Sequence, residues 1–193
     1  TGAVTGLREM RTDRPDATES PFTVDPGHVQ LEMDFANLTE DRRDAGRTRE
    51  WALAPFDLRL GFTPRFELGV FAEPFDRTST TPPGGPHETR TGYGDITLRG
   101  KWSDAGNDAG GFAWGVIADV KLPTATSGLG NGKMEGGLIL PIAVSLPKGW
   151  DFGAMTAMGM HYNQRGYQGA WLNTATLGHG LTRNTSGYVE VTS

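Results

Sequence analysis

The sequence predicts an all-β protein, an antiparallel up-and-down transmembrane β-barrel with about nine strands. Apolar and polar residues alternate with a period of two along most of the chain, and helical periodicity is scarce. The 28 glycines and 12 prolines are many for a helical domain. No stretch approaches the roughly 20 consecutive apolar residues of a transmembrane helix. A β-barrel needs no such run, because only every second residue of each strand meets lipid.

The chain divides into two parts. Residues 1–27 are polar and rich in turn formers, which predicts an irregular leader that is either periplasmic or folded into the lumen. Residues 28–193 hold the predicted barrel strands, and the first of them shows Val29, Leu31 and Met33 alternating with polar residues. Further alternating runs lie near residues 51–62, 66–73, 95–102, 113–122, 138–146, 150–160, 170–181 and 187–192. Pro55 predicts a bulge or bend in the second run, because proline cannot donate to a β-ladder.

The expected connections alternate in length. Long ones are predicted at residues 38–49, 76–93 and 123–134, medium ones at 103–111 and 161–169, and short ones at 63–65, 147–149 and 182–186. Outer-membrane barrels have short periplasmic turns and longer outside loops. This rhythm therefore favours a bacterial outer membrane, with the leader at the periplasmic side.

The polar face of the strands mixes both charge signs with glycine and alanine. The residues predicted to line the lumen are Glu32, Asp34, Asp57, Arg59, Glu67, Glu73, Arg99, Lys101, Asp119 and Lys121. In a narrow, wet lumen these side chains could form ion pairs across the wall. Alternation alone leaves a second reading open, since a lipocalin-like soluble barrel has the same period with its apolar face inward.

Aromatic residues concentrate where the predicted strands begin and end. The tryptophans expected in girdles at the two membrane interfaces are Trp51, Trp102, Trp114, Trp150 and Trp171. The alternative is that aromatic residues at strand ends cap the core of a soluble barrel.

The leader carries a group of charged residues with two readings. Asp13, Arg14, Asp16 and Glu19 could fold into the lumen, pair with cations of the wall at Arg59, Arg99 or Lys101, and narrow the pore. The alternative is a disordered periplasmic tail.

The leader also carries a resemblance. Residues 12–21 (TDRPDATESP) and 24–32 (VDPGHVQLE) resemble the start of the outer-membrane proteins named for the meta-pathway of phenol degradation, and residues 92–95, 121–124 and 128–137 add glycine-rich matches. The similarity runs through most of residues 10–192. It implies a predicted outer-membrane β-barrel that passes small molecules, and it identifies no cargo. Family members continue through further strands before the barrel closes, so we expect that closing strands are missing here or that the chain pairs with something else.

Several other functions are disfavoured. The chain has no cysteine, which excludes disulfides, thiolate zinc sites and thiol catalysis. The mild net charge of −5 without a basic aromatic cluster argues against nucleic acid. Residues 127–133 resemble a phosphate loop only superficially, because a strand rather than a helix follows. The four histidines, His28, His87, His161 and His179, are scattered, so no metal site, cofactor or catalytic residue is predicted; His179 with Ser186 is the one conceivable hydrolase pair.

The sequence therefore predicts a non-enzymatic outer-membrane channel or transporter for small solutes, aromatic or apolar ones among them. Its expected partners are the lipid bilayer, the solute and other chains that complete or adjoin the barrel. Two alternatives stay open: a soluble barrel that binds an apolar ligand, and a structural barrel subunit of a larger envelope assembly.

Overall fold

The computed structural model describes residues 6–8, 10–13, 17–43, 46–106, 111–183 and 185–193. Apart from one 3-10 turn at Pro147–Gly149, the regular structure of these residues is antiparallel β-sheet. The larger sheet has nine strands in the order β1 (Val29–Met33), β4 (Phe56–Thr63), β5 (Phe66–Ala72), β8 (Ile96–Ala105), β9 (Phe112–Leu122), β10 (Glu135–Leu146), β11 (Trp150–Asn163), β12 (Gly166–Thr182) and β13 (Thr185–Thr192). The smaller sheet has four, β2 (Ala36–Arg43), β3 (Gly46–Leu53), β6 (Phe75–Thr81) and β7 (Glu88–Gly92).

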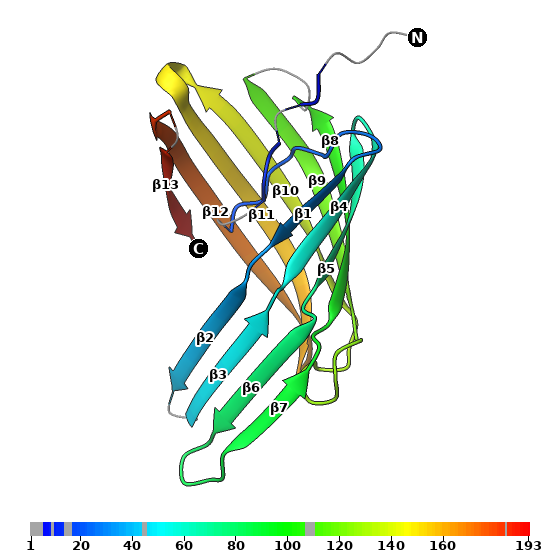
Figure 1. Ribbon diagram of the computed structural model, residues 1–193, viewed down its shortest axis with the longest axis vertical. Coiled ribbons are helices and arrows are strands. Elements are labelled where there is room, and N and C mark those ends of the chain that lie inside the picture. Colours follow the sequence, from blue (N-terminus) through cyan, green and yellow to red (C-terminus); the bar gives the residue numbers. More distant parts are fainter. Residues whose placement is uncertain (1–5, 9, 14–16, 44–45, 107–110, 184) are drawn as a thin grey trace.

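The smaller sheet continues four strands of the larger one (Figure 1). In each of these four segments the strand is interrupted for a few residues between the larger and the smaller sheet. Backbone hydrogen bonds join neighbouring segments within this interruption, from Asp34 N to Pro55 O at 3.1 Å and from Gly94 N to Glu73 O at 2.9 Å. Ala54 has a positive φ of 52°, the backbone of a bulge. The bend predicted at Pro55 is confirmed. When each strand of the smaller sheet is counted together with the strand that it continues, the thirteen strands form nine antiparallel segments with up-and-down connectivity.

The predicted long loops at 38–49 and 76–93 are wrong. Residues 38–43 and 46–49 belong to the hairpin of β2 and β3, and residues 76–81 and 88–92 to that of β6 and β7. The connection at 161–169 is also shorter than predicted, because β11 runs to Asn163 and β12 starts at Gly166. These segments are largely polar on both faces, so they lack the alternation of apolar and polar residues that predicts a strand. The 123–134 connection does separate β9 from β10.

The larger sheet is strongly curved and open (Figure 1). Its edge strands are β1 and β13, and within the described residues each pairs with one neighbour only, β4 and β12 respectively. The all-β, antiparallel part of the predicted architecture is thus confirmed, while the sheet does not close into a barrel here. No helix among the described residues is long and apolar enough to cross a membrane.

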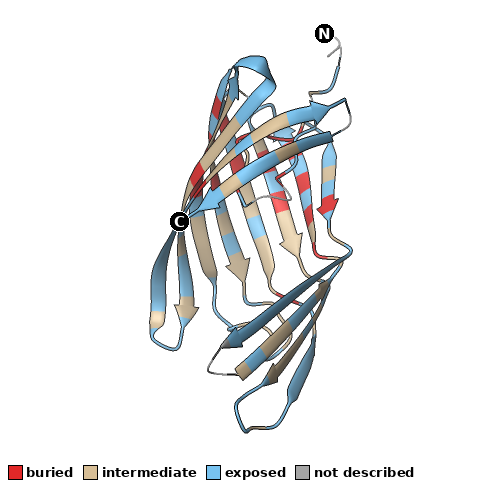
Figure 2. Cartoon of the chain, turned by 90° about the vertical axis from the view of Figure 1, so that its left-hand side faces the viewer, coloured by how far each residue is buried: buried red, intermediate tan, exposed pale blue. Residues whose placement is uncertain are grey.

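The two faces of the larger sheet differ in chemistry. The concave face buries charged side chains, above all Arg59, Lys101 and Glu67, and only a small apolar cluster that contains Ile117. The convex face exposes large apolar side chains from every strand of the larger sheet, among them Val29, Leu31, Leu60, Leu68, Leu98, Trp102, Val120, Leu138, Leu140, Met158, Trp171 and Val191. Figure 2 shows the buried positions on the larger sheet and the leader, whereas no described side chain of the smaller sheet is buried.

A leader fills the concave face

The leader lies across the concave face of the larger sheet (Figure 1). Close approach of the leader backbone to the sheet depends on Gly61 of β4, where a Cβ would lie 2.2 Å from the carbonyl oxygen of Asp25. A Cβ on Gly115 of β9 would lie 2.5 Å from the carbonyl oxygen of Trp102 in the neighbouring strand β8, and at an ordinary contact distance of 3.5 Å from Pro21 of the leader. Since real Cβ atoms do not approach backbone atoms so closely, a side chain at either glycine would force the leader or the sheet to move.

Asp13 is the centre of the contact between leader and wall. Its carboxylate lies 2.5 Å from Lys101 Nζ on β8 and 3.1 Å from an Arg59 guanidinium nitrogen on β4. It also accepts a hydrogen bond from the Ser20 hydroxyl at 2.6 Å, while its own backbone N–H donates to Glu32 on β1. Lys101 is fully buried and Arg59 is 2% exposed. A charge so far from water needs paired, hydrogen-bonded partners, and the leader supplies one of them.

Arg59 ties the leader to three strands. It donates to Glu67 on β5 at 2.8 Å and to Glu32 at 2.9 Å, and its remaining guanidinium hydrogens reach carbonyl oxygens of the leader at Arg11 and Phe22. Glu67 in turn accepts the backbone N–H of Val24 at 2.7 Å. Every direction of the guanidinium fork is therefore used, which fixes the leader in one register.

The leader crosses toward the opposite edge of the sheet through two further residues, Glu19 and Thr18. Glu19 pairs with Arg99 of β8 at 2.6 Å. The Thr18 hydroxyl lies 2.6 Å from both the Thr174 hydroxyl on β12 and the Glu190 carboxylate on β13. With the contacts of Asp13 to β1 and β4, the leader thus bridges both edge strands of the open sheet.

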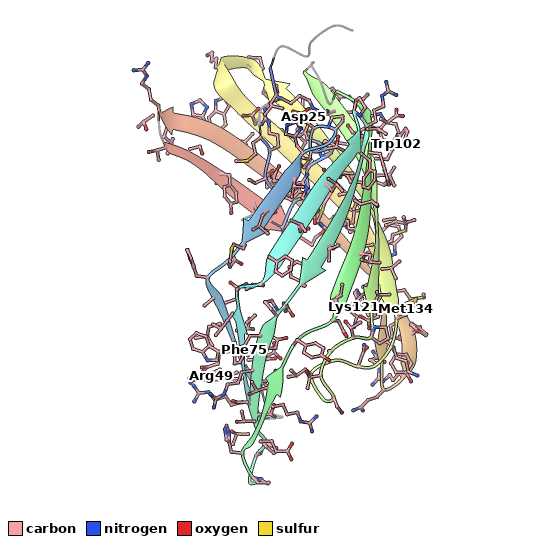
Figure 3. All side chains as sticks on the ribbon, turned by 45° about the vertical axis from the view of Figure 1, so that its right-hand side comes forward. Asp25, Arg49, Phe75, Trp102, Lys121 and Met134 are labelled. Carbon is pink, nitrogen blue, oxygen red and sulfur yellow. The ribbon has the colours of Figure 1, made fainter. Side chains whose placement is uncertain are left out.

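Eight of the ten residues predicted to line the lumen belong to strands whose polar side faces the leader or the hollow below it. Glu32, Arg59, Glu67 and Lys101 form one ion-pair cluster, and Asp57, 8% exposed, and Arg99 lie on the same face. Asp119 and Lys121 line the hollow farther along the face, where Lys121 pairs with Asp95 at 2.8 Å and with Glu135 at 3.1 Å (Figure 3).

The other two predicted residues lie at the level of the break between the sheets. Asp34 accepts a hydrogen bond from the Asn37 side chain at 3.0 Å. Glu73 follows β5 and lies beside Asp76 at the start of β6. Among the leader residues, Asp13 and Glu19 meet the cations that the sequence suggested, whereas Arg14 and Asp16 lie outside the described residues.

Sequence reasoning missed several partners. Thr18, Ser20, Thr174 and Glu190 were not singled out, because uncharged or isolated polar residues carry no pattern of their own. Asp95 directly precedes β8 and Glu135 is the first residue of β10, each next to a glycine-rich segment. This position at the start of a strand is the one feature of the sequence that could have indicated their ion pairs with Lys121.

The five tryptophans of the predicted girdles are all exposed. Trp102, Trp114 and Trp150 lie near the strand ends at the leader's side of the sheet, and Trp102 extends a row of rings through Phe66 (centroids 6.5 Å apart) to Phe62 (Figure 3). Trp51 and Trp171 lie toward the opposite end, inside β3 and β12 rather than at their first residues.

The histidines lie apart and each has local contacts. His179 Nδ1 donates to the Gly149 carbonyl oxygen at 2.9 Å, and its ring stacks on Trp150 with ring centroids 4.5 Å apart. His161 approaches Glu135, His87 lies between two threonines, and His28 contacts the Pro26 carbonyl. No group of three or more histidine, aspartate or glutamate side chains in the described part of the chain could hold a metal ion.

The pKa values of two leader carboxyls are shifted in opposite directions. Burial acts to raise the pKa of Asp13, but the charges of Lys101 and Arg59 outweigh it and lower that pKa from 3.8 to about 2. Burial raises the pKa of Glu19 above its usual 4.5 despite the attraction of Arg99. Asp13 therefore stabilises the attachment of the leader above pH 3.8 and loses that contribution as the pH falls to about 2. The contribution of Glu19 is lost as the pH rises through its raised pKa.

We expect the leader to detach on acidification. Because the chain has no cysteine, a spin label attached to Ala17→Cys would report on the leader alone. Its motion should increase as the pH falls from about 4 toward 2, a range in which protonation of Asp13 removes about 2 kcal/mol. In an Asp13→Asn background the acid transition should disappear. A label that stays equally immobile at pH 2 and pH 5 in the unmodified leader would contradict the assignment of Asp13 as the anchor.

Comparison with known proteins identifies one family. The family described as "Putative MetA-pathway of phenol degradation" matches residues 12–192, which includes the leader from Thr12 and all thirteen strands. None of the curated proteins matches the sequence. Because the match extends over nearly the whole chain, the protein belongs to this family.

Proposed function

We propose that this sheet is the wall of an outer-membrane β-barrel, and that the protein is a passive channel for small solutes whose lumen is narrowed by the leader. The observation that carries the proposal is the distribution of polarity between the faces. The convex face exposes Leu98, Leu140 and Trp171, whereas the concave face buries Arg59 and Lys101. Apolar outside and polar inside is the arrangement of a transmembrane barrel.

The same observation separates this proposal from a soluble ligand-binding barrel. Such a barrel needs an apolar interior and a polar exterior. The described concave face has only a small apolar cluster, Ile117, Ile139 and Met155, beside a large charged one. An exposed apolar surface on this scale is normally covered by a partner or by lipid.

The passage that we propose for solute is a hollow beside the leader. The concave face has a hollow of about 440 Å³ between the leader and the opposite end of the sheet. Its lining combines cations and acids with apolar side chains and small residues, including Thr97, Arg99, Asp119, Lys121, Glu135, Gly137, Ile139, Ala157, His161 and Leu172. Mixed charge in a constricted, wet passage can select small molecules by size and polarity.

The open edges bear on how the wall is completed. Within lipid, an unpaired strand edge costs several kcal/mol for each exposed backbone group. We therefore propose that β1 and β13 pair with further strands in the membrane, supplied by the same protein or by an adjoining chain. A structural subunit of a larger assembly would share this need, and conductance separates the two roles.

Paired substitutions on neighbouring residues of β8 test the orientation. Leu98, 46% exposed, faces outward, and Thr97 lines the hollow on the other face. We expect Leu98→Arg to lower the free energy of unfolding in lipid vesicles by about 2–4 kcal/mol, the cost of arginine near the bilayer midplane. Thr97→Arg should cost clearly less. Denaturant titration in vesicles measures both. Equal effects of the two substitutions would count against a lipid-facing convex surface.

Channel activity is tested directly in planar bilayers and by liposome swelling. The protein should insert, migrate differently in gels before and after heating, and pass ions and small uncharged solutes. A protein that inserts yet conducts neither would overturn the channel and leave the structural subunit. A protein that stays monodisperse in water without detergent would overturn the membrane barrel.

A further inference from the structure

The smaller sheet has one strongly basic face. Directly paired residues share a face, so the register places Arg42 beside Arg47, Glu40 beside Arg49, and Trp51 beside Arg77. Among the described side chains of this face, four arginines meet a single acid, Glu40, which leaves three positive charges. The opposite face instead carries Asp41, Glu50, Asp76 and Glu88 with Arg90 among its described side chains.

The basic face is the outward one. On the other face, Asp76 lies beside Glu73, a Cβ on Gly92 would meet the Thr126 side chain, and a Cβ on Gly94 would meet both acids. The segment containing Thr126 contacts Asp95, which pairs with Lys121 in the hollow. The acidic face therefore continues the concave surface, and the arginine face continues the convex one. Figure 3 shows Arg49 and Phe75 on this sheet.

Along this outward face the side chains change in a fixed order. From the larger sheet toward the hairpin ends, β3 presents Leu53, then Trp51, then Arg49 and Arg47. Leu38 and Phe75 add apolar surface beside the first two. At about 3.3 Å per residue, Arg49 lies about 7 Å beyond Trp51. Apolar, aromatic and then cationic is the order in which a membrane presents hydrocarbon, interface and headgroup phosphate.

Three of the four arginines border a hollow of about 410 Å³. It is lined by Arg47, Arg49, Trp51, Arg77, Ser79, Thr81 and His87. Glu40 bonds to Arg47 at 2.7 Å and Arg49 at 2.9 Å, which holds these two side chains in place. The guanidinium groups match phosphate oxygens, while the hydroxyls of Ser79 and Thr81 and the imidazole of His87 can bond sugar hydroxyls.

We propose that this face, defined by Arg42, Arg47, Arg49, Arg77 and Trp51, is a docking surface for the phosphorylated sugar headgroup of a membrane glycolipid. Charge complementarity identifies the phosphate, and continuity with the lipid-facing surface identifies a lipid rather than a free anion. The inference rests on the proposed membrane barrel. It adds a specific lipid partner at the end of the barrel opposite the leader.

The test uses detergent-solubilised protein and a lipid A probe with two phosphates, compared with the same lipid carrying none. The double variant Arg49→Gln/Arg77→Gln should bind the phosphorylated lipid at least tenfold more weakly than the unchanged protein. The matched control, Arg90→Gln/Arg165→Gln, removes the same charge at the same end of the molecule. It should bind as the unchanged protein does. Native mass spectrometry or titration of thermal stability gives the affinities.

The outcomes decide separately on the lipid site and on the channel. Equal binding by Arg49→Gln/Arg77→Gln and the unchanged protein, or equal loss in both double variants, overturns the site. So does full competition by millimolar inorganic phosphate, which would indicate a site for free anions. Conductance in bilayers of phosphatidylcholine, which contain no lipid A, should be the same for the unchanged protein and for Arg49→Gln/Arg77→Gln, whose substituted residues lie on the outward face. Absent conductance with intact, arginine-dependent lipid binding would overturn the channel and leave the lipid site standing.

Discussion

Replacing Lys101 by alanine is expected to lower the free energy of unfolding by about 3–5 kcal/mol, the cost of breaking a buried ion pair from one side. Lys101 is fully buried, and its ammonium lies 2.5 Å from Asp13 and 3.7 Å from Glu67. Without it, the two carboxylates share Arg59 as their remaining close cation. Denaturant titration of the protein in vesicles or detergent measures the loss.

A double-mutant cycle separates the ion pair from simple packing. Asp13→Asn/Lys101→Met removes both charges and keeps most of the volume, so it should recover much of the loss, because no unpaired charge remains. Arg65→Met is the control, since Arg65 is exposed at the turn after β4, and it should change stability by less than about 0.5 kcal/mol. If Lys101→Ala and Arg65→Met destabilise equally, the ion-pair cluster does not hold the leader. Additivity of the Asp13 and Lys101 substitutions would count against their direct coupling.

The charged cluster was partly predictable because it follows from strand alternation. Arg59, Glu67 and Lys101 occupy the polar positions of strands with clear period two, so their common face follows once the register is fixed. Which cation meets which leader carboxylate does not follow, since the leader has no repeating pattern. The close approach at Gly61 and the Thr18–Thr174 contact depend on where the leader crosses the sheet, and only the fold supplies that.

The smaller sheet was missed for a physical reason. Outside the level where one face meets lipid or a core, a strand needs no apolar side, so β6 (FDRTSTT) and β7 (ETRTG) are rich in polar residues. Their threonines favour strands but do not alternate with apolar residues. The same lack of alternation hid the arginine face, because its members become neighbours only through the pairing of β2, β3 and β6.

Loosening the leader is expected to raise conductance severalfold. Asp13→Asn/Glu19→Gln removes the two carboxylates that bind Lys101, Arg59 and Arg99. The wall remains balanced without them, since Glu32, Asp57 and Glu67 face Arg59, Arg99 and Lys101 on the concave side. The barrel should therefore stay folded while the leader moves away from the lumen. Single-channel recording in planar bilayers measures the change.

A disulfide allows conductance with the leader attached and with the leader released to be compared in one protein. The hydroxyl oxygens of Thr18 and Thr174 lie 2.6 Å apart, so Thr18→Cys/Thr174→Cys places two sulfurs within bonding reach in a chain that has no other cysteine. Added to Asp13→Asn/Glu19→Gln, the oxidised pair should restore the low conductance and reduction should release it. Added to the otherwise unchanged protein, oxidation should alter nothing, because the buried ion pairs already hold the leader. Conductance that ignores the disulfide in both backgrounds would mean that solute bypasses the leader and that the constriction lies elsewhere in the lumen.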